Sequence, residues 1–172
     1  MMKRFFIFVA LVSFVLSGFS QKFAYVDTEY ILKNIPTFDA AQKKLDQYSI
    51  EWQKEIEDIF ADIDKMYKEY QAEKVLLTDE LRVKRENEIV AREKEAKELQ
   101  KKYFGQEGEL YTKRKELIKP IQDDIYNAIK EVASEANLDF IFDSGSSSVN
   151  LLFANPQFDR SDDVLEKLGY KN

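Results

Sequence analysis

The feature that most constrains the fold is a long series of apolar residues that recur every three or four positions. These positions are Phe38, Ala41, Leu45, Tyr48, Trp52, Ile56, Ile59, Ile63, Met66 and Tyr70. Spacings that alternate between three and four place all of these side chains along one stripe of an α-helix, which is the pattern of a coiled-coil seam. Such a helix cannot bury its stripe alone, so the sequence requires a partner helix.

A second helical stretch supplies this partner. Its weaker seam positions are Ile89, Ala96, Leu99, Tyr103, Leu110 and Leu117. In an antiparallel pair, the numbers of facing residues have a constant sum, and pairs such as Ile59 with Ala96 all add to 155. The sequence therefore predicts a helical hairpin that turns between Leu77 and Thr78. Thr78 is a suitable N-cap with acidic residues behind it, so we expect the tip near residues 75–80.

Two prolines mark the base of this arm. Pro36 and Pro120 lie opposite each other in the same register, and proline interrupts helical hydrogen bonding. We therefore expect an arm over residues 37–119. The remaining residues, 21–36 and 120–172, are expected to form a body.

The body is expected to contain a small β-sheet. Alternation over residues 23–27 predicts a short strand, and apolar runs at 138–143 and 148–155 flank the sequence SGSSS, which indicates a hairpin that the first strand joins. A helix should cover this sheet with one apolar face, made of Ile121, Ile125, Ala128, Ile129 and Val132. A last short helix is expected with Ser161 as its N-cap and Gly169 as its stop.

A body of roughly 70 residues is near the lower size limit for an independent core. The chain has no cysteine, so disulfides cannot stabilise it. We therefore predict oligomerisation through the strand edges. The candidate residues are Phe23, Tyr25, Val26, Phe140, Phe142, Leu151, Leu152 and Phe153. The expected fold class is α+β, with a long antiparallel coiled-coil arm on a small β-barrel or β-sheet body.

Residues 1–20 have the pattern of a signal peptide. Lys3 and Arg4 precede an apolar run at 5–16, and small residues follow before Gln21. The alternative is an uncleaved membrane anchor, but the run is shorter than the ~20 residues that a spanning helix needs. We expect cleavage and export.

Composition argues against several functions. The formal net charge of −6 disfavours nucleic acid as a partner. The absence of His and Cys removes the commonest general base, the thiol nucleophile and the usual zinc ligands. Asp123, Asp124 and the acidic stretch 159–163 could be calcium ligands, although a solvated face and helix-end charge also explain them. We therefore expect no catalytic residue, no metal and no cofactor.

Several stretches together resemble a known family. They are KFAYVDTEYILKNIP, the long charged hairpin, KRKELIKPIQDDIYNAIKEVASEANLDFIFD and LLFANPQFDRSDDVLEKL. In this order they are similar to the Skp/OmpH periplasmic chaperones. The resemblance implies a homotrimer with a central β-barrel and three helical-hairpin arms that enclose a cavity. It also implies ATP-independent holding of unfolded outer-membrane β-barrel proteins in the periplasm.

Aromatic residues beside the seam are candidates for client binding. Phe60 and Tyr67 are seven residues apart, as are Phe104 and Tyr111, so each pair lines one side of its helix. The alternative is that these rings widen the core between the helices.

The tip is a further candidate, because Val75, Leu76 and Leu77 are apolar and have basic neighbours. Any membrane contact is expected to be weak and to involve the arm tips. Gly105 and Gly108 interrupt the return helix and indicate either a flexible arm or tolerated surface glycines. The alternative function for the whole chain is a structural coiled-coil spacer of the cell envelope.

Overall fold

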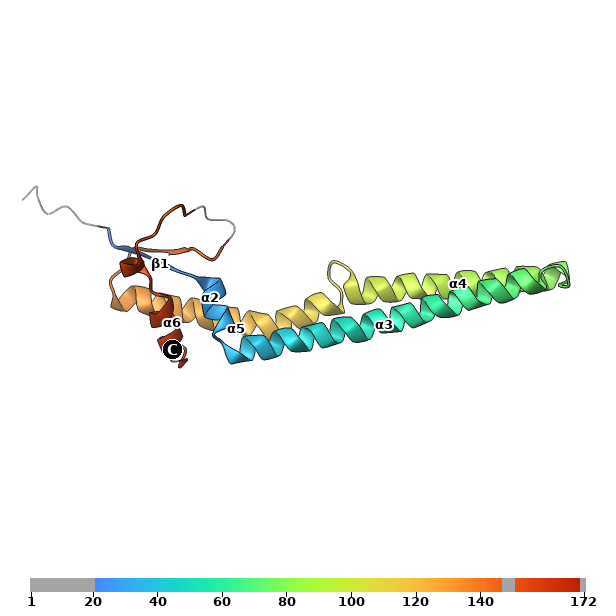
Figure 1. Cartoon of the computed structure of the whole chain (residues 1–172), viewed down its shortest axis with the longest axis horizontal. Helices are drawn as coiled ribbons and strands as arrows, with labels where there is room; N and C mark the ends of the chain where they lie inside the picture. Colours follow the sequence, from blue (N-terminus) through green and yellow to red (C-terminus); the bar gives the residue numbers. More distant parts are fainter. Residues whose placement is uncertain (1–20, 147–150, 171–172) are drawn as a thin grey trace, which may run out of the picture. The chain divides into compact units, whose positions relative to one another are not determined.

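The structure, a computed structural model, describes residues 21–146 and 151–170. The chain divides into two compact units. We call Ile35–Asp124 the arm unit, and residues 21–34 with 125–170 the body unit (Figure 1). The expected signal peptide, residues 1–20, lies outside the described residues.

The arm unit is a helical hairpin. Helix α3 (Pro36–Glu73) runs outward and α4 (Asp79–Phe104) returns beside it (Figure 1). Helix α5 (Glu109–Glu135) continues the return. Pro36 occupies the first turn of α3, where a fixed φ and a missing N–H are tolerated. The predicted cap is confirmed, because the Thr78 hydroxyl accepts a hydrogen bond from the Leu81 N–H at 3.4 Å.

The predicted seam and its register are confirmed. The buried apolar residues of the hairpin are Ala41, Leu45, Ile56, Ile59, Ile63, Tyr70, Ile89, Ala96, Tyr103 and Ile118. Ile59 and Ala96 belong to one buried cluster, as the constant sum requires. The Trp52 ring stacks on that of Tyr103, with centroids 4.7 Å apart. Near the base, Ile118 is buried, whereas the expected Leu117 is only partly buried.

Three tyrosines link the two helices by donating their hydroxyls to glutamates across the hairpin. The bonds run from Tyr67 to Glu93 at 3.0 Å, from Tyr70 to Glu86, and from Tyr103 to Glu55 at 2.8 Å. Each carboxylate favours the neutral phenol, and this hydrogen bond is the main reason that the pKa of all three tyrosines is raised above 10.0.

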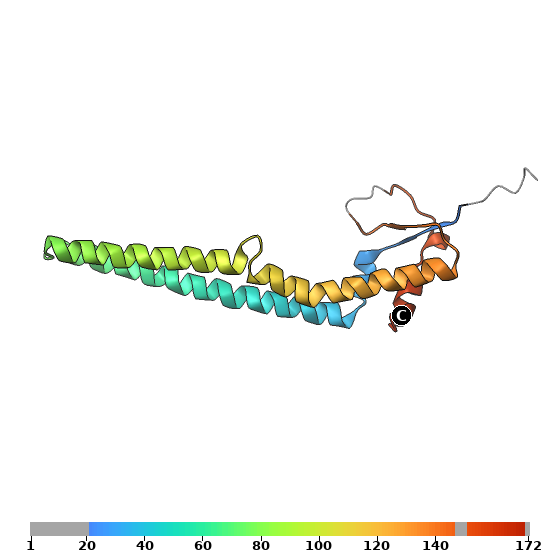
Figure 2. The ribbon, with the colours of Figure 1, turned by 180° about the vertical axis from the view of Figure 1, so that it is seen from behind.

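The body unit contains a two-stranded parallel sheet. Strand β1 (Phe23–Val26) pairs with β2 (Phe140–Asp143), and Phe23 lies opposite Phe140 (Figure 2). The predicted pairing of these two distant segments is confirmed. The other elements of this unit are α2 (Thr28–Lys33), the last part of α5, the 3₁₀ turn η1 (Pro156–Phe158) and α6 (Ser161–Lys167).

The core of the body unit is small. Its buried apolar residues are Ala24, Val26, Ile31, Ile125, Ala128, Val132, Val164 and Leu165. Ala24 and Val26 alternate with exposed or half-buried residues along β1, so only one face of this strand is buried. The predicted apolar face of α5 is confirmed by the burial of Ile125, Ala128 and Val132.

The predicted strand at residues 148–155 is wrong for the part that the structure describes. Residues 151–155 contain no strand, and 148–150 lie outside the described residues. Within the described chain, the sheet has only β1 and β2. Apolar and aromatic composition favours a strand only where a neighbouring strand provides hydrogen bonds, and this run has none.

Two expected helix boundaries are also wrong. Helix α5 runs through Pro120 instead of ending there. Buried Ile118 and Ile125 flank this proline, and their packing offsets the lost helical hydrogen bond. Ser161 is the first residue of α6 and Arg160 is the N-cap, while the Ser161 hydroxyl accepts from the Asp27 N–H at 2.8 Å. The expected stop is confirmed, because Gly169 has a φ of 82°.

Alkaline pH should weaken the hairpin. Because the folded-state pKa of the three linking tyrosines is raised, their stabilisation is complete below pH 10.0 and is lost as the pH rises through the folded-state value. We expect the free energy of unfolding, measured with urea and circular dichroism, to fall above that pH. Replacing Tyr67, Tyr70 and Tyr103 with Phe should reduce this fall, and an unchanged pH profile would contradict the prediction.

Candidate interaction surfaces

One face of the two-stranded sheet is aromatic and open. Phe23, Phe140 and Phe142 are each about half exposed, although large aromatic side chains are usually buried. The Phe158 ring of η1 lies 5.4 Å from that of Phe23. Tyr25 shares this face, and burial, followed by the nearby Asp159 carboxylate, raises its pKa. We call these five residues the outer sheet face.

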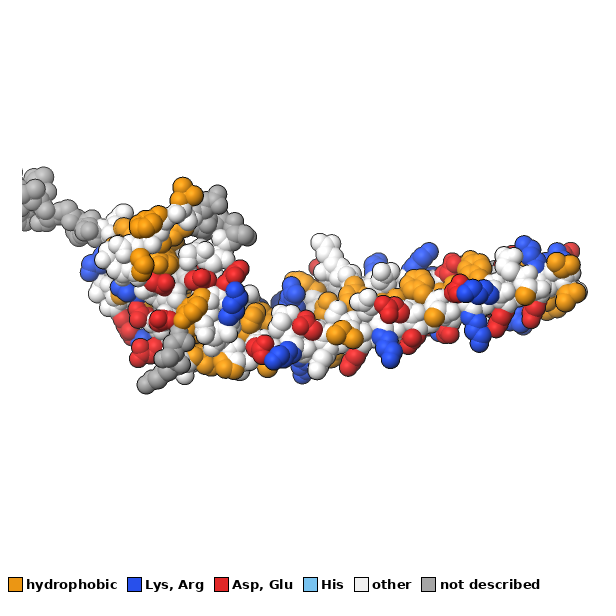
Figure 3. Space-filling model, in the orientation of Figure 1, with side chains coloured by type: hydrophobic (Ala, Val, Ile, Leu, Met, Phe, Trp, Pro, Cys, Tyr) orange, Lys and Arg blue, Asp and Glu red, His pale blue; other side chains and the backbone are white. Residues whose placement is uncertain are grey.

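An apolar segment borders the outer sheet face. Leu151, Leu152 and Phe153 are exposed, Leu152 by 99% and Phe153 by 83%. Leu151 and Phe153 line a hollow of about 270 Å³ together with residues of the outer sheet face. Figure 3 shows hydrophobic side chains gathered on this part of the body unit. A contiguous exposed apolar surface of this kind usually marks a site of interaction with another molecule.

The sheet also has a free edge. On its far side from β2, β1 is covered, because the Tyr25 carbonyl accepts from the Arg160 N–H at 2.9 Å. Within the described residues, β2 pairs with β1 alone. Its outer hydrogen-bonding edge is therefore available to another strand.

Val26 differs from the other predicted oligomerisation residues. It is only 1% exposed and belongs to the core of the body unit itself. Strand alternation explains this, because Val26 points away from the face that carries Phe23 and Tyr25. The remaining predicted residues all lie on or beside the outer sheet face.

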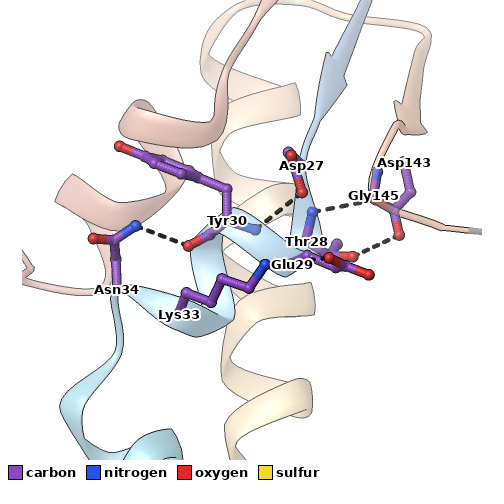
Figure 4. Close-up of polar contacts among 8 residues, drawn as sticks. All are labelled: Asp27, Thr28, Glu29, Tyr30, Lys33, Asn34, Asp143 and Gly145. Carbon is purple, nitrogen blue, oxygen red and sulfur yellow. Dashed lines mark hydrogen bonds and ion pairs between the residues drawn. The ribbon is translucent and has the colours of Figure 1, made fainter.

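The ends of both strands are tied together by Asp143. Its carboxylate accepts from the Thr28 hydroxyl at 2.7 Å, from the Thr28 N–H at 3.2 Å and from the Gly145 N–H at 3.0 Å (Figure 4). Asp27 caps α2 by accepting from the Tyr30 N–H at 2.9 Å. These bonds hold the residues directly after β2 against the start of α2.

On the arm, the four predicted aromatic residues are all exposed. The exposed fraction of Phe60, Tyr67, Phe104 and Tyr111 is 38% or more. None of them is therefore a buried core residue of this chain. Phe104 touches the aromatic stack edge-on, with its ring centroid 6.5 Å from that of Trp52.

Further exposed apolar residues on the arm were not predicted. Val83 and Val90 on α4 are more than half exposed, as is Ile50 on α3. Val83 and Val90 are seven residues apart, which is the same signal that identified the aromatic pairs. In a helix this rich in charge, two isolated valines were not distinguishable from tolerated surface residues.

The three predicted tip residues have different surroundings. Val75 and Leu76 are 88% and 86% exposed, and Figure 3 shows hydrophobic side chains at this end of the hairpin. Leu77 instead packs against the buried cluster of the seam. Part of the basic charge at the tip is neutralised, because Arg82 pairs with Asp79 at 3.2 Å and Arg85 with Glu88 at 3.3 Å.

The acidic clusters have structural contacts. Asp123 accepts from the Lys119 ammonium at 2.7 Å, and Asp159 accepts from the Ser161 hydroxyl at 2.6 Å. Among the described residues, no group of three or more acidic, His or Cys side chains is placed to hold a metal ion. In the same part of the chain, no helix is both long and apolar enough to cross a bilayer.

Comparison with known proteins identifies the family. The family described as outer membrane protein (OmpH-like) matches residues 22–168. The chain belongs to the OmpH-like family. Its fold is similar to the crystal structure of a protein from Caulobacter crescentus whose proposed role is that of an outer membrane chaperone (OmpH-like). The TM-score is 0.68 at 14% sequence identity, over 86% of this chain and 83% of the other. A search of curated proteins finds no match.

Gly145 should be essential for the turn that follows β2 in this OmpH-like chain. A Cβ at this position would lie 2.5 Å from the Asp27 carboxylate and 2.9 Å from the Glu29 nitrogen. We expect Gly145→Ala to lower the free energy of unfolding by about 1–3 kcal/mol in urea denaturation. Asp139→Ala, which removes only an exposed bond to Lys22, is the control. Equal stability of the two variants would mean that the turn relaxes without cost.

Proposed function

We propose that this OmpH-like chain is an exported, ATP-independent holdase chaperone. It would bind unfolded outer-membrane β-barrel proteins in a cavity between the arms of a trimer and prevent their aggregation. Membership of the OmpH-like family supports a chaperone role. The observation that carries the proposal is an arm whose seam is already filled, yet whose outside still carries exposed aromatic and aliphatic side chains.

The arm surface suits weak, unspecific apolar binding. Phe60, Tyr67, Phe104 and Tyr111 are spread along the hairpin, and all four are exposed. Unfolded outer-membrane proteins expose many apolar and aromatic segments. Several weak contacts from three arms would give useful avidity without a single tight site. Such holding requires neither a nucleotide nor a metal.

A trimer would resolve the exposed features of the body unit. An isolated two-stranded sheet is marginal in water, and among the described residues nothing pairs with one of its edges or covers its outer face completely. A second and a third copy, each adding strands beside β2, would cover the outer sheet face and close the sheet into a barrel. The segment 151–153 lies beside this face and would be buried by the same contact.

The proposed location is the periplasm, which the name of the family suggests and which a cleaved signal peptide at residues 1–20 would require. Membrane contact would be weak and limited to Val75 and Leu76 at the tips, because paired acids reduce the positive charge there. The alternative function, a structural spacer, does not explain exposed aromatic residues beside a filled seam. No catalytic role and no nucleic-acid partner is proposed.

The trimer is testable by light scattering. We expect the mature protein to have three times the mass of one chain at micromolar concentration. Phe140→Ser combined with Phe142→Ser should reduce this mass, because both side chains belong to the outer sheet face. Tyr126→Ser changes a more exposed ring on α5 and should leave the mass unchanged. A folded monomer of the unchanged sequence would refute the barrel.

Client holding is testable with an arm variant. Replacing Phe60, Tyr67, Phe104 and Tyr111 together with Ser should abolish the suppression of aggregation of an unfolded β-barrel protein, measured by turbidity. The mass in solution and most of the helical circular dichroism should be retained, because the buried seam residues are unchanged, although the Tyr67–Glu93 bond and the edge contact of Phe104 with Trp52 are lost.

The control replaces Asp123 and Asp124 with Ala, which should have little effect on holding. If the arm variant holds the client as well as the unchanged protein does, the binding surface lies elsewhere. Val75 and Leu76 would then be the next residues to replace, since they are the most exposed apolar side chains of the arm.

A further inference from the structure

The return side of the arm is broken, whereas the outgoing side is not. Helix α4 ends at Phe104 and α5 begins at Glu109, while α3 continues without interruption opposite this point. Residues 105–108 leave the helical path as a loop that projects sideways between α4 and α5 (Figure 2).

This break does not change the register of the seam. Before it, Tyr103 stacks on Trp52. After it, Leu110 packs in the cluster that contains Leu45. Tyr103 and Leu110 are seven residues apart on the return side, and their partners Trp52 and Leu45 are seven residues apart on the outgoing side. Seven residues of α-helix advance about 10.5 Å and return to the same face within ~20°, so a continuous helix would keep both contacts.

The broken form depends on two glycines. Gly105 ends α4 by donating its N–H to the Lys101 carbonyl at 2.9 Å, and a Cβ there would lie 2.3 Å from that oxygen. A Cβ on Gly108 would lie 2.8 Å from the carbonyl oxygens of Lys102 and Tyr103. Any side chain at either glycine would therefore have to displace backbone atoms.

The loop is held by a few local hydrogen bonds. The Gly108 N–H donates to the Gly105 carbonyl at 2.9 Å, and the Thr112 N–H and hydroxyl donate to the Gly108 carbonyl at 3.0 and 3.2 Å. The hollow beside it, of about 750 Å³, is lined by glycines and by polar or charged residues, with no apolar side chain among them. Gln106 and Glu107 within the loop are good helix formers. Glycine inside a helix opposes the continuous form, and the helical hydrogen bonds of these residues favour it. These two opposing contributions are of the same order of magnitude.

We propose that residues 105–108 are a helix switch, in which the return helix interconverts between the broken form and a continuous helix without a shift of the seam. In the continuous form, Phe104 and Tyr111 lie on one stripe, about two turns apart. In the broken form they belong to separate helices. The switch is a property of the hairpin and does not depend on client binding.

Two variants of the whole protein should move the switch in opposite directions. Gly105→Ala with Gly108→Ala should favour the continuous helix by roughly 30-fold. Gln106→Pro should fix the broken form, because proline is excluded from a helix interior. The backbone of Gly105, with φ −62° and ψ 169°, already suits a residue that precedes proline.

Hydrogen exchange of a peptide covering residues 105–112, followed by mass spectrometry, measures the equilibrium. We expect the fastest exchange in Gln106→Pro, intermediate exchange in the unchanged protein, and exchange slower by at least ~10-fold in the double alanine variant. The emission of Trp52, the only tryptophan, should be the same in all three proteins because the register is kept.

Equal exchange in the unchanged protein and in Gln106→Pro would overturn the proposal, because the break would then be permanent. A changed Trp52 emission in a folded double alanine variant would also overturn it, since closing the loop would then shift the seam. If that variant does not fold, the comparison between Gln106→Pro and the unchanged protein still decides.

Discussion

The parallel pairing of β1 with β2 is the contact on which the rest of the structure depends. Parallel neighbours cannot be joined by a tight turn and need a long crossover. Here the crossover comprises α2, the hairpin and the last part of α5, so everything between Val26 and Phe140 must leave the sheet and come back to it. An antiparallel hairpin meets this condition at any length, because its two ends always lie together. Asp143 then secures the junction through Thr28 and Gly145.

The arm could be predicted from the sequence because its information is periodic. A seam of alternating spacings fixes the buried stripe, and the constant sum of facing residues fixes the register without any knowledge of the body. The body could not be derived in the same way. The apolar run at 151–153 has the composition of a strand but lies exposed. Pro120 stays within α5, because neighbouring packing outweighs a local rule. The hydroxyl of Ser161 bonds to a backbone N–H distant in sequence, which no local pattern reveals.

Part of the candidate surfaces could also be predicted from regular spacing in the sequence. A spacing of seven found the aromatic residues outside the seam, and the structure places them in solvent. Alternation along β1 could have separated Val26 from Phe23 and Tyr25, but this requires knowing which face the helices cover. Composition alone does not show which residue of a turn faces the seam, so it does not separate Leu77 from Val75 and Leu76. Whether Gly105 and Gly108 make the arm flexible or are simply tolerated depends on their contacts with preceding carbonyl groups. These contacts can be seen only in the three-dimensional structure.

The narrow seam makes the hairpin nearly one-dimensional. Each buried side chain contacts mainly the layers directly before and after it, as in the separate clusters around Ile59 and around Leu45. In such a ladder the free energy needed to unfold both helices as far as a given layer grows with the number of layers between that layer and the nearest end. The turn at residues 74–78 holds the two helices together covalently, but both helices end at it, so local unfolding can start from it. The protection of the helical hydrogen bonds should therefore increase layer by layer from the turn towards Ala41, so that the contacts along the arm differ in how long they last.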